Sequence, residues 1–176
     1  GRLRAYDFDA EELWSSLVFP SESAVVQIAT RDDGSGTVSI RERVEDEEWG
    51  WLGRLGRVEP AGGVSWLYDP NIDCEGTAYL DVAVLEDGRT VAARSVWTVL
   101  TPSEDDSLHF IDMISEDGEL EWTEQINLPR EDWRRYSQRV ALAPDNTVVV
   151  TTNWVRADED GGVLGRSYTL TKVALD

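Results

Sequence analysis

Apolar and polar residues alternate with a period of two along most of the chain, a pattern typical of β-strands that bury one face. Three segments share a common order: an alternating strand, a turn rich in glycine or asparagine, and a second strand that opens with Thr-Val. These hairpins are predicted at residues 24–30 with 37–43, 78–84 with 90–96, and 138–143 with 147–153. The pattern therefore predicts a chain made of β-hairpins.

The hairpins recur at a nearly constant interval. Their opening threonines, Thr37, Thr90 and Thr147, are 53 and 57 residues apart. This interval predicts repeats of the propeller-blade kind, which place four antiparallel strands in about 40 to 55 residues. Trp97 and Trp154 each follow their threonine by seven residues, and this equivalence favours a packing role for both.

A second hairpin follows each of the first two and carries a tryptophan on its outer strand. These second hairpins are predicted at residues 51–58 with 64–68 and at residues 107–114 with 120–126. Trp66 and Trp122 on the outer strands are 56 residues apart, and Trp14 precedes Trp66 by 52. The chain is therefore expected to start in the middle of a repeat.

Counting the predicted strands gives two, four, four and three along the chain. The expected fold class is all-β, with blades of four antiparallel strands in an incomplete or half β-propeller. We expect one propeller-like domain over residues 1–176. It is expected to hold the back half of a blade at 1–19, blades at 20–70 and 71–128, and an incomplete blade at 129–176.

One segment lacks the strand pattern. Residues 130–136, Arg-Glu-Asp-Trp-Arg-Arg-Tyr, follow Pro129 and are predicted to form a helix of about two turns at most. We expect this helix to connect two blades.

Three short motifs end in the outer-strand tryptophans. The stretches at 118–122 (Gly-Glu-Leu-Glu-Trp), at 62–66 (Gly-Gly-Val-Ser-Trp) and, more weakly, at 10–14 (Ala-Glu-Glu-Leu-Trp) resemble the Gly-x-Leu-x-Trp hallmark of quinoprotein-like β-propellers with PQQ-type repeats. The resemblance implies that each tryptophan docks between neighbouring blades. The copy at 10–14 lacks the glycine, and the third repeat lacks the motif.

The resemblance also implies that this chain is part of a larger ring. Propellers of this family usually close with roughly six to eight blades, whereas the sequence predicts about three. An uncovered blade face is prone to aggregation. We therefore expect the ring to be completed by another chain or by the rest of a longer chain.

The chain is strongly acidic, with 35 acidic and 16 basic residues and a formal net charge of −19. Such a charge repels polyphosphates, so binding to nucleic acid or to an anionic membrane surface is disfavoured. No run of about 18 apolar residues is present, so we expect no membrane insertion. Cys74 is the only cysteine, which excludes an intramolecular disulfide.

Few residues are available for catalysis. His109 is the only histidine and is expected to be a strand residue rather than a general base. The sequence has neither a Gly-x-Ser-x-Gly elbow nor a phosphate-binding loop. The quinone-dependent dehydrogenases of the resembled family need a calcium site, a cofactor-stacking tryptophan and, in many members, a disulfide of adjacent cysteines. None of these can be mapped onto this chain by motif, so we expect no cofactor.

Acidic turns recur along the chain. They are Asp32-Asp33-Gly34, Glu86-Asp87-Gly88, Glu116-Asp117-Gly118 and Asp158-Glu159-Asp160-Gly161. Oxygen-rich loops suit calcium, but none of these has the ligand spacing of a dedicated calcium loop. Glycine in a hairpin turn tolerates positive φ. We therefore expect the turns to serve the backbone and to bind no metal.

Three of the eight tryptophans, Trp49, Trp51 and Trp133, lie in connections where no repeat position requires them. Aromatic residues on loops above a rigid scaffold often grip a sugar face or a protein loop, with packing at a blade edge as the alternative. We expect a non-catalytic binding or scaffolding module, exported to the periplasm or cell surface, that engages a protein or glycan through these tryptophans. The runner-up is a hydrolase or lyase that uses paired carboxylates in a propeller channel.

Overall fold

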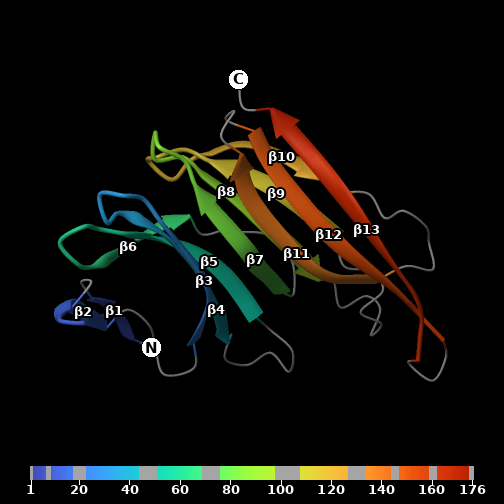
Figure 1. Cartoon of the computed structure of the whole chain (residues 1–176), viewed down its shortest axis with the longest axis horizontal. Helices are drawn as coiled ribbons and strands as arrows, with labels where there is room; N and C mark the ends of the chain where they lie inside the picture. Colours follow the sequence, from blue (N-terminus) through green and yellow to red (C-terminus); the bar gives the residue numbers. More distant parts are fainter. Residues whose placement is uncertain are drawn as a thin grey trace.

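The chain is an all-β protein, as the alternating pattern predicted (Figure 1). The computed structural model describes residues 2–6, 9–17, 23–43, 51–68, 76–97, 108–126, 134–143, 147–158 and 162–174. Within these residues the chain forms thirteen strands and no helix. The strands make antiparallel, blade-like sheets of an incomplete propeller, and the described strands do not close into a barrel.

The strands fall into four groups in chain order. The N-terminal hairpin pairs β1 (Arg2–Tyr6) with β2 (Glu12–Leu17). The first sheet contains β3 (Ser23–Thr30), β4 (Gly36–Arg43), β5 (Trp51–Val58) and β6 (Val64–Tyr68). The second sheet contains β7 (Gly76–Val84), β8 (Thr90–Trp97), β9 (Leu108–Ile114) and β10 (Leu120–Gln125). The third sheet contains β11 (Arg134–Ala143), β12 (Thr147–Ala157) and β13 (Val163–Ala174).

The groups of two, four, four and three strands match the predicted numbers. Each sheet pairs its strands in sequence order, and one parallel pair between Trp51 and Gly76 joins the first sheet to the second. Figure 1 shows the groups as a row, from β1 and β2 at the lower left to β11, β12 and β13 at the right.

Hydrophobic side chains fill the space between successive groups. Between the N-terminal hairpin and the first sheet lie Leu3, Trp14, Val38, Ile40 and Val58. Between the first and second sheets lie Leu55, Tyr68, Tyr79, Val82, Ala92 and Ile114. Between the second and third sheets lie Leu85, Val91, Ile111, Met113, Trp122, Val148 and Val150. The two four-stranded sheets therefore bury both faces, as propeller blades do.

Two of the outer-strand tryptophans lie between neighbouring groups, as the resemblance implied. Trp14 of the N-terminal hairpin packs on the first sheet, and Trp122 of the second sheet packs on the cluster shared with the third. Trp154 is fully buried and donates a hydrogen bond of 2.8 Å to Thr169, which confirms its packing role. The side chains of Trp66 and Trp97 lie outside the described part of the structure.

Four loops of identical hydrogen bonding connect the strands of the first two sheets. In each five-residue loop the N–H of the first residue donates to the C=O of the fifth residue. The N–H of a glycine at the fourth position donates to the C=O of the first residue. These glycines, Gly34, Gly62, Gly88 and Gly118, have φ between 83° and 90°. Because side chains with a Cβ rarely adopt such φ values, the backbone explains the glycines of three acidic turns, Gly34, Gly88 and Gly118. Gly161 of the fourth acidic turn lies outside the described residues.

The predicted helix at residues 130–136 is wrong over the part that the structure describes. Arg134 and Arg135 begin β11, where they pair with Val155 and Trp154 of β12. Cross-strand pairing therefore overrides the local helical preference of this segment. Residues 130–133 lie outside the described residues.

Candidate binding surfaces

The three tryptophans predicted to bind a partner fall almost entirely outside the described residues. Trp49 and Trp133 are not described. Trp51 is the first residue of β5, where its backbone pairs with Arg43 and Gly76, but its side chain is not described. Their role in binding therefore stays a prediction.

His109 is a strand residue in β9, as predicted, and its side chain is buried. Its Nδ1 lies 2.9 Å from the hydroxyl of Ser95 on the neighbouring strand β8. The imidazole also meets the edge of Trp154, with ring centroids 6.0 Å apart. A Ser–His pair can activate a nucleophile, but these residues are 0% and 4% exposed, so a substrate cannot reach them. We interpret the pair as part of the packing between the second and third sheets.

A buried ion pair lies on the opposite face of the second sheet. Arg94 donates two hydrogen bonds to Asp112, one of them 3.0 Å long, and its guanidinium stacks 4.6 Å above the ring of Phe110. The hydroxyl of Thr123 donates a third hydrogen bond of 2.6 Å to Asp112. Burial lowers the pKa of Arg94, but hydrogen bonding and the charge of Asp112 outweigh it, so the pKa is raised. The polar groups satisfy one another, as a structural ion pair requires.

Sequence reasoning missed both of these buried pairs. Ser95 and His109 are 14 residues apart, and Arg94 and Asp112 are 18 apart. The register of β8 against β9 was the available signal, because it places Ser95 opposite His109. Predicting that register requires the length of the connection and the bulges, which local patterns do not provide.

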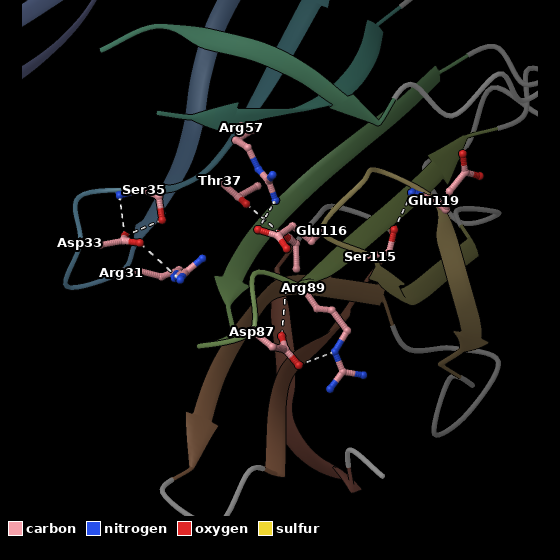
Figure 2. Close-up of polar contacts among 11 residues, drawn as sticks. Arg31, Asp33, Ser35, Thr37, Arg57, Asp87, Arg89, Ser115, Glu116 and Glu119 are labelled. Carbon is pink, nitrogen blue, oxygen red and sulfur yellow. Dashed lines mark hydrogen bonds and ion pairs between the residues drawn. The ribbon is translucent and has the colours of Figure 1, made fainter. Parts of the chain in front are cut away.

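A polar cleft of about 230 Å³ opens between the first and second sheets at the ends that carry the glycine loops (Figure 2). These loops share one end because β5 and β7 run parallel. Two arginines of the cleft wall pair with carboxylates: Arg31 lies 3.3 Å from Asp33, and Arg57 of the first sheet lies 3.7 Å from Glu116 of the second. The wall of the cleft therefore carries both positively and negatively charged side chains.

Two aspartates of the acidic turns at this end, Asp33 and Asp87, have lowered pKa values. Hydrogen bonds from the hydroxyl and N–H of Ser35, at 2.5 and 2.9 Å, keep the pKa of Asp33 below its ordinary value. At Asp87 slight burial raises the pKa, but the hydrogen bonds from Arg89 lower it by more, so the pKa is lowered overall. A general acid needs a raised pKa. Asp33 and Asp87 therefore suit turn stabilisation rather than acid catalysis.

The third sheet differs from the rest of the chain in its charge. Its strands contain no aspartate or glutamate, although the whole chain has 35. They hold six of the sixteen basic residues: Arg134, Arg135, Arg139, Arg156, Arg166 and Lys172. The strands of the third sheet are therefore basic, whereas the segments that join them in the sequence carry the acidic residues Asp145, Asp158, Glu159 and Asp160.

The outward face of the third sheet exposes apolar side chains that the sequence did not locate. Val148 and Val150 face the second sheet, so alternation turns Thr151 and its partner Leu170 away from it. On this outward face Tyr168 is 69% exposed and Leu170 is 67% exposed. The exposed cations Arg139, Arg166 and Lys172 surround these two side chains on the same face. We call these five residues the cationic face.

The third sheet also has an open edge. In the first and second sheets the third strand pairs with a fourth, β6 or β10. Among the described residues, β13 pairs only with β12. An open edge and an open face together are typical of a surface that another polypeptide covers.

The described part of the chain shows neither a metal site nor a membrane span. No group of three or more histidine, cysteine, aspartate or glutamate side chains converges there to hold an ion. No helix in the same residues is long and apolar enough to cross a bilayer.

Neither a known protein family nor a curated protein matches the sequence. Among solved structures, the chain is similar to a protein of unknown function from Dyadobacter fermentans (12% identity, TM-score 0.52), over 85% of this chain and 40% of that one. It also matches a protein of unknown function from Bacteroides caccae (13% identity, TM-score 0.44), over 91% of this chain and 51% of that one. The Dyadobacter likeness concerns the fold alone. The chain spans about half or less of the length of these proteins.

Proposed function

We propose that the protein is a non-catalytic binding or scaffolding module and that the cationic face of its third sheet engages a protein partner. The observation that carries this proposal is the exposure of Tyr168 and Leu170 on a sheet whose opposite face packs on the second sheet. Exposed apolar residues rimmed by charge are typical of protein interfaces. A flat face of aliphatic and aromatic side chains suits another protein better than a glycan.

The scaffold is part of the same proposal. We propose that the sheets are repeats of a quinoprotein-like propeller and that another chain, or the rest of a longer chain, completes the ring. The tryptophans between groups, Trp14 and Trp122, support this assignment. Export to the periplasm or cell surface, and a second binding site for protein or glycan at Trp49, Trp51 and Trp133, also belong to the proposal.

The geometry favours this function over the hydrolase or lyase alternative. Catalysis by paired carboxylates needs one group with a raised pKa, whereas the pKa values of Asp33 and Asp87 in the turns are lowered. The serine and histidine that could form a nucleophilic pair are buried. A screen with chromogenic glycosides and esters tests the alternative, and turnover well above the buffer rate would support it.

Partner capture with matched variants tests the binding function. The double variant Tyr168→Ser/Leu170→Ser removes the apolar centre of the cationic face. The control variant Val25→Ser/Ile28→Ser changes two exposed apolar residues of β3 instead. We expect the face variant to reduce recovery of bound proteins at least about tenfold in quantitative mass spectrometry, because the centre of an interface contributes most of its affinity. Equal recovery by wild type and face variant would contradict the proposal.

A further inference from the structure

We propose that the polar cleft between the first and second sheets binds a ligand that carries both a carboxylate and a basic side chain, such as free arginine or the C-terminal arginine of a peptide. The cleft lies apart from the cationic face, so this site goes beyond the proposed function. Figure 2 shows it at the end of the sheets that carries the glycine loops. Its volume of about 230 Å³ is below the roughly 300 to 1,000 Å³ typical of pockets for drug-sized ligands, so it suits a ligand of amino-acid size.

Two arginines of the first sheet line the cleft and can bind the carboxylate. Arg31 is the first residue of the loop after β3, and Arg57 lies near the end of β5. Their side chains are 27% and 25% exposed, so each lies mostly within the protein and still reaches the cleft. A guanidinium presents its N–H groups in a planar fork that matches the two oxygens of a carboxylate.

The protein leaves donors of both guanidiniums available. The carboxylate oxygens paired with them lie 3.3 Å from Arg31, on Asp33, and 3.7 Å from Arg57, on Glu116. Hydrogen bonds between arginine and a carboxylate are shorter, at about 2.7 to 2.9 Å. Asp33 also accepts hydrogen bonds from the hydroxyl and the N–H of Ser35, so it is held by its own turn. A ligand carboxylate can therefore bind Arg31 and Arg57 more closely than these neighbours do.

The loops around the cleft are strongly acidic. Each of the four glycine loops contributes at least one residue to the cleft wall. Together the loops contain two basic residues, Arg31 and Arg89, and eight acidic residues. The acidic residues are Asp32, Asp33, Glu59, Glu86, Asp87, Glu116, Asp117 and Glu119. When Arg57 is included, three positive charges stand against eight negative ones, a local net charge of −5.

This distribution of charge favours a ligand with charges of both signs. The acidic loops repel a simple anion, whereas the guanidiniums in the wall repel a simple cation. A ligand with one carboxylate and a basic side chain can place its carboxylate against Arg31 and Arg57. Its cation then meets Glu59 and Glu116, which line the cleft and are exposed. The net charge of −19 favours the approach of that cation.

Calorimetric titration with L-arginine and two analogues tests the ligand. At about 0.1 M ionic strength, where the screening length is roughly 10 Å, L-arginine should bind with a dissociation constant below about 1 mM. Agmatine lacks the carboxylate, and L-citrulline has a neutral group of similar shape in place of the guanidinium. Each should bind at least about tenfold more weakly. Agmatine carries more positive charge than L-arginine, so it would bind more tightly if charge alone mattered.

A third analogue, N-acetyl-L-arginine, distinguishes the two sources of the ligand. It keeps the carboxylate and the guanidinium but has no ammonium group, as at the C-terminus of a peptide. An affinity within about tenfold of that of L-arginine would assign the site to a peptide C-terminus, and a greater loss would assign it to the free amino acid. Both results support the proposed ligand chemistry.

A matched pair of variants tests whether the ligand lies in the cleft. Arg57→Gln removes a guanidinium that lines the cleft, and Arg89→Gln removes one that does not. Both arginine side chains are 25% exposed, and each substitution removes one positive charge. Arg57→Gln should weaken the binding of L-arginine at least about tenfold, whereas Arg89→Gln should change it less than about twofold. Circular dichroism confirms that both variants are folded.

Three results would overturn the proposed site. The first is a titration in which L-arginine gives no saturable heat. The second is binding of agmatine or L-citrulline as tight as that of L-arginine. The third is an equal loss of affinity in Arg57→Gln and Arg89→Gln. None of them changes what Tyr168 and Leu170 bind, so the proposed function stands or fails separately.

Discussion

The hydroxyl oxygens of Thr37 and Thr90 lie 2.7 Å apart, buried between the first and second sheets, although 53 residues separate them. The two threonines open equivalent strands, but they do not hold equivalent places in the ladders. In the second sheet, Thr90 pairs with Val84 and Ile114, the ends of the two neighbouring strands. The equivalent position in the first sheet is Gly36, which pairs with Thr30 and Val58. Thr37 is therefore one residue further along its strand. Because side chains alternate, Thr37 faces the second sheet while Thr90 faces the first.

Replacing both threonines should lower the free energy of unfolding by less than the sum of the two single replacements. Thr37→Val leaves the hydroxyl of Thr90 buried without this hydrogen bond, and we expect a loss of about 1 to 3 kcal/mol in the free energy of unfolding. The same holds for Thr90→Val. The double variant removes both polar groups, so its loss should be clearly smaller than the two single losses added. Urea unfolding of the three variants measures this coupling, and strictly additive losses would show that the contact is absent.

The glycine loops predict a difference between two substitutions at Gly34. This residue has φ of 83°, and a Cβ would meet only Pro60, at an ordinary contact distance of 3.9 Å. Gly34→Ala should therefore destabilise the protein by about 1 to 2 kcal/mol through backbone strain alone. Gly34→Asn should cost less, because asparagine adopts positive φ more readily. Thermal unfolding compares the two variants, and an equal loss from both would refute the assigned loop conformation.

Burial should decide how much each ion pair contributes to stability. Asp112 is fully buried, so Asp112→Ala leaves the guanidinium of Arg94 without its partner, and we expect a loss of about 3 to 5 kcal/mol. The control is Asp87→Ala, which removes an exposed carboxylate that pairs with Arg89 and should cost less than about 1 kcal/mol. Chemical unfolding of both variants measures the two losses. Similar values would contradict the assigned environments.

Acidification should remove the contribution of Asp87. Its pKa in the folded protein lies below the ordinary value of 3.8, so its stabilising effect is complete above about pH 4 and is lost as the pH falls through the folded pKa. The difference in melting temperature between wild type and Asp87→Asn should therefore be constant near neutrality and shrink below about pH 4. Comparing the two proteins cancels the titration of the other carboxylates. A difference that grows on acidification would reverse the sign of the assigned shift.

The sequence was sufficient to predict the strands because their signals are local. The hairpin at 51–58 and 64–68 has the predicted bounds, and the loop glycines lie where the Asp-Gly turns placed them. Period-two alternation and turn chemistry act within a few residues, so they can be recognised without knowledge of the fold. The segment at 130–136 failed because its strand pairing depends on β12, about 20 residues further along the chain.

The candidate surface could not be predicted for a different physical reason. Tyr168 and Leu170 alternate with inward-facing residues in the same way as buried strand residues do. Only the three-dimensional order of the sheets shows that no described strand covers them. The absence of acidic residues from β11, β12 and β13 was visible in the sequence, but its meaning depends on their being the outermost sheet.

Hydrogen exchange monitored by mass spectrometry tests the central claim that packed sheets end in one open binding face. The second sheet is covered on both faces, so peptides from β8 should exchange slowest at every protein concentration. Peptides from β13 should exchange quickly in dilute protein and slow markedly when a partner covers the third sheet. Protection of β13 equal to that of β8 in the dilute, unpartnered protein would contradict the account.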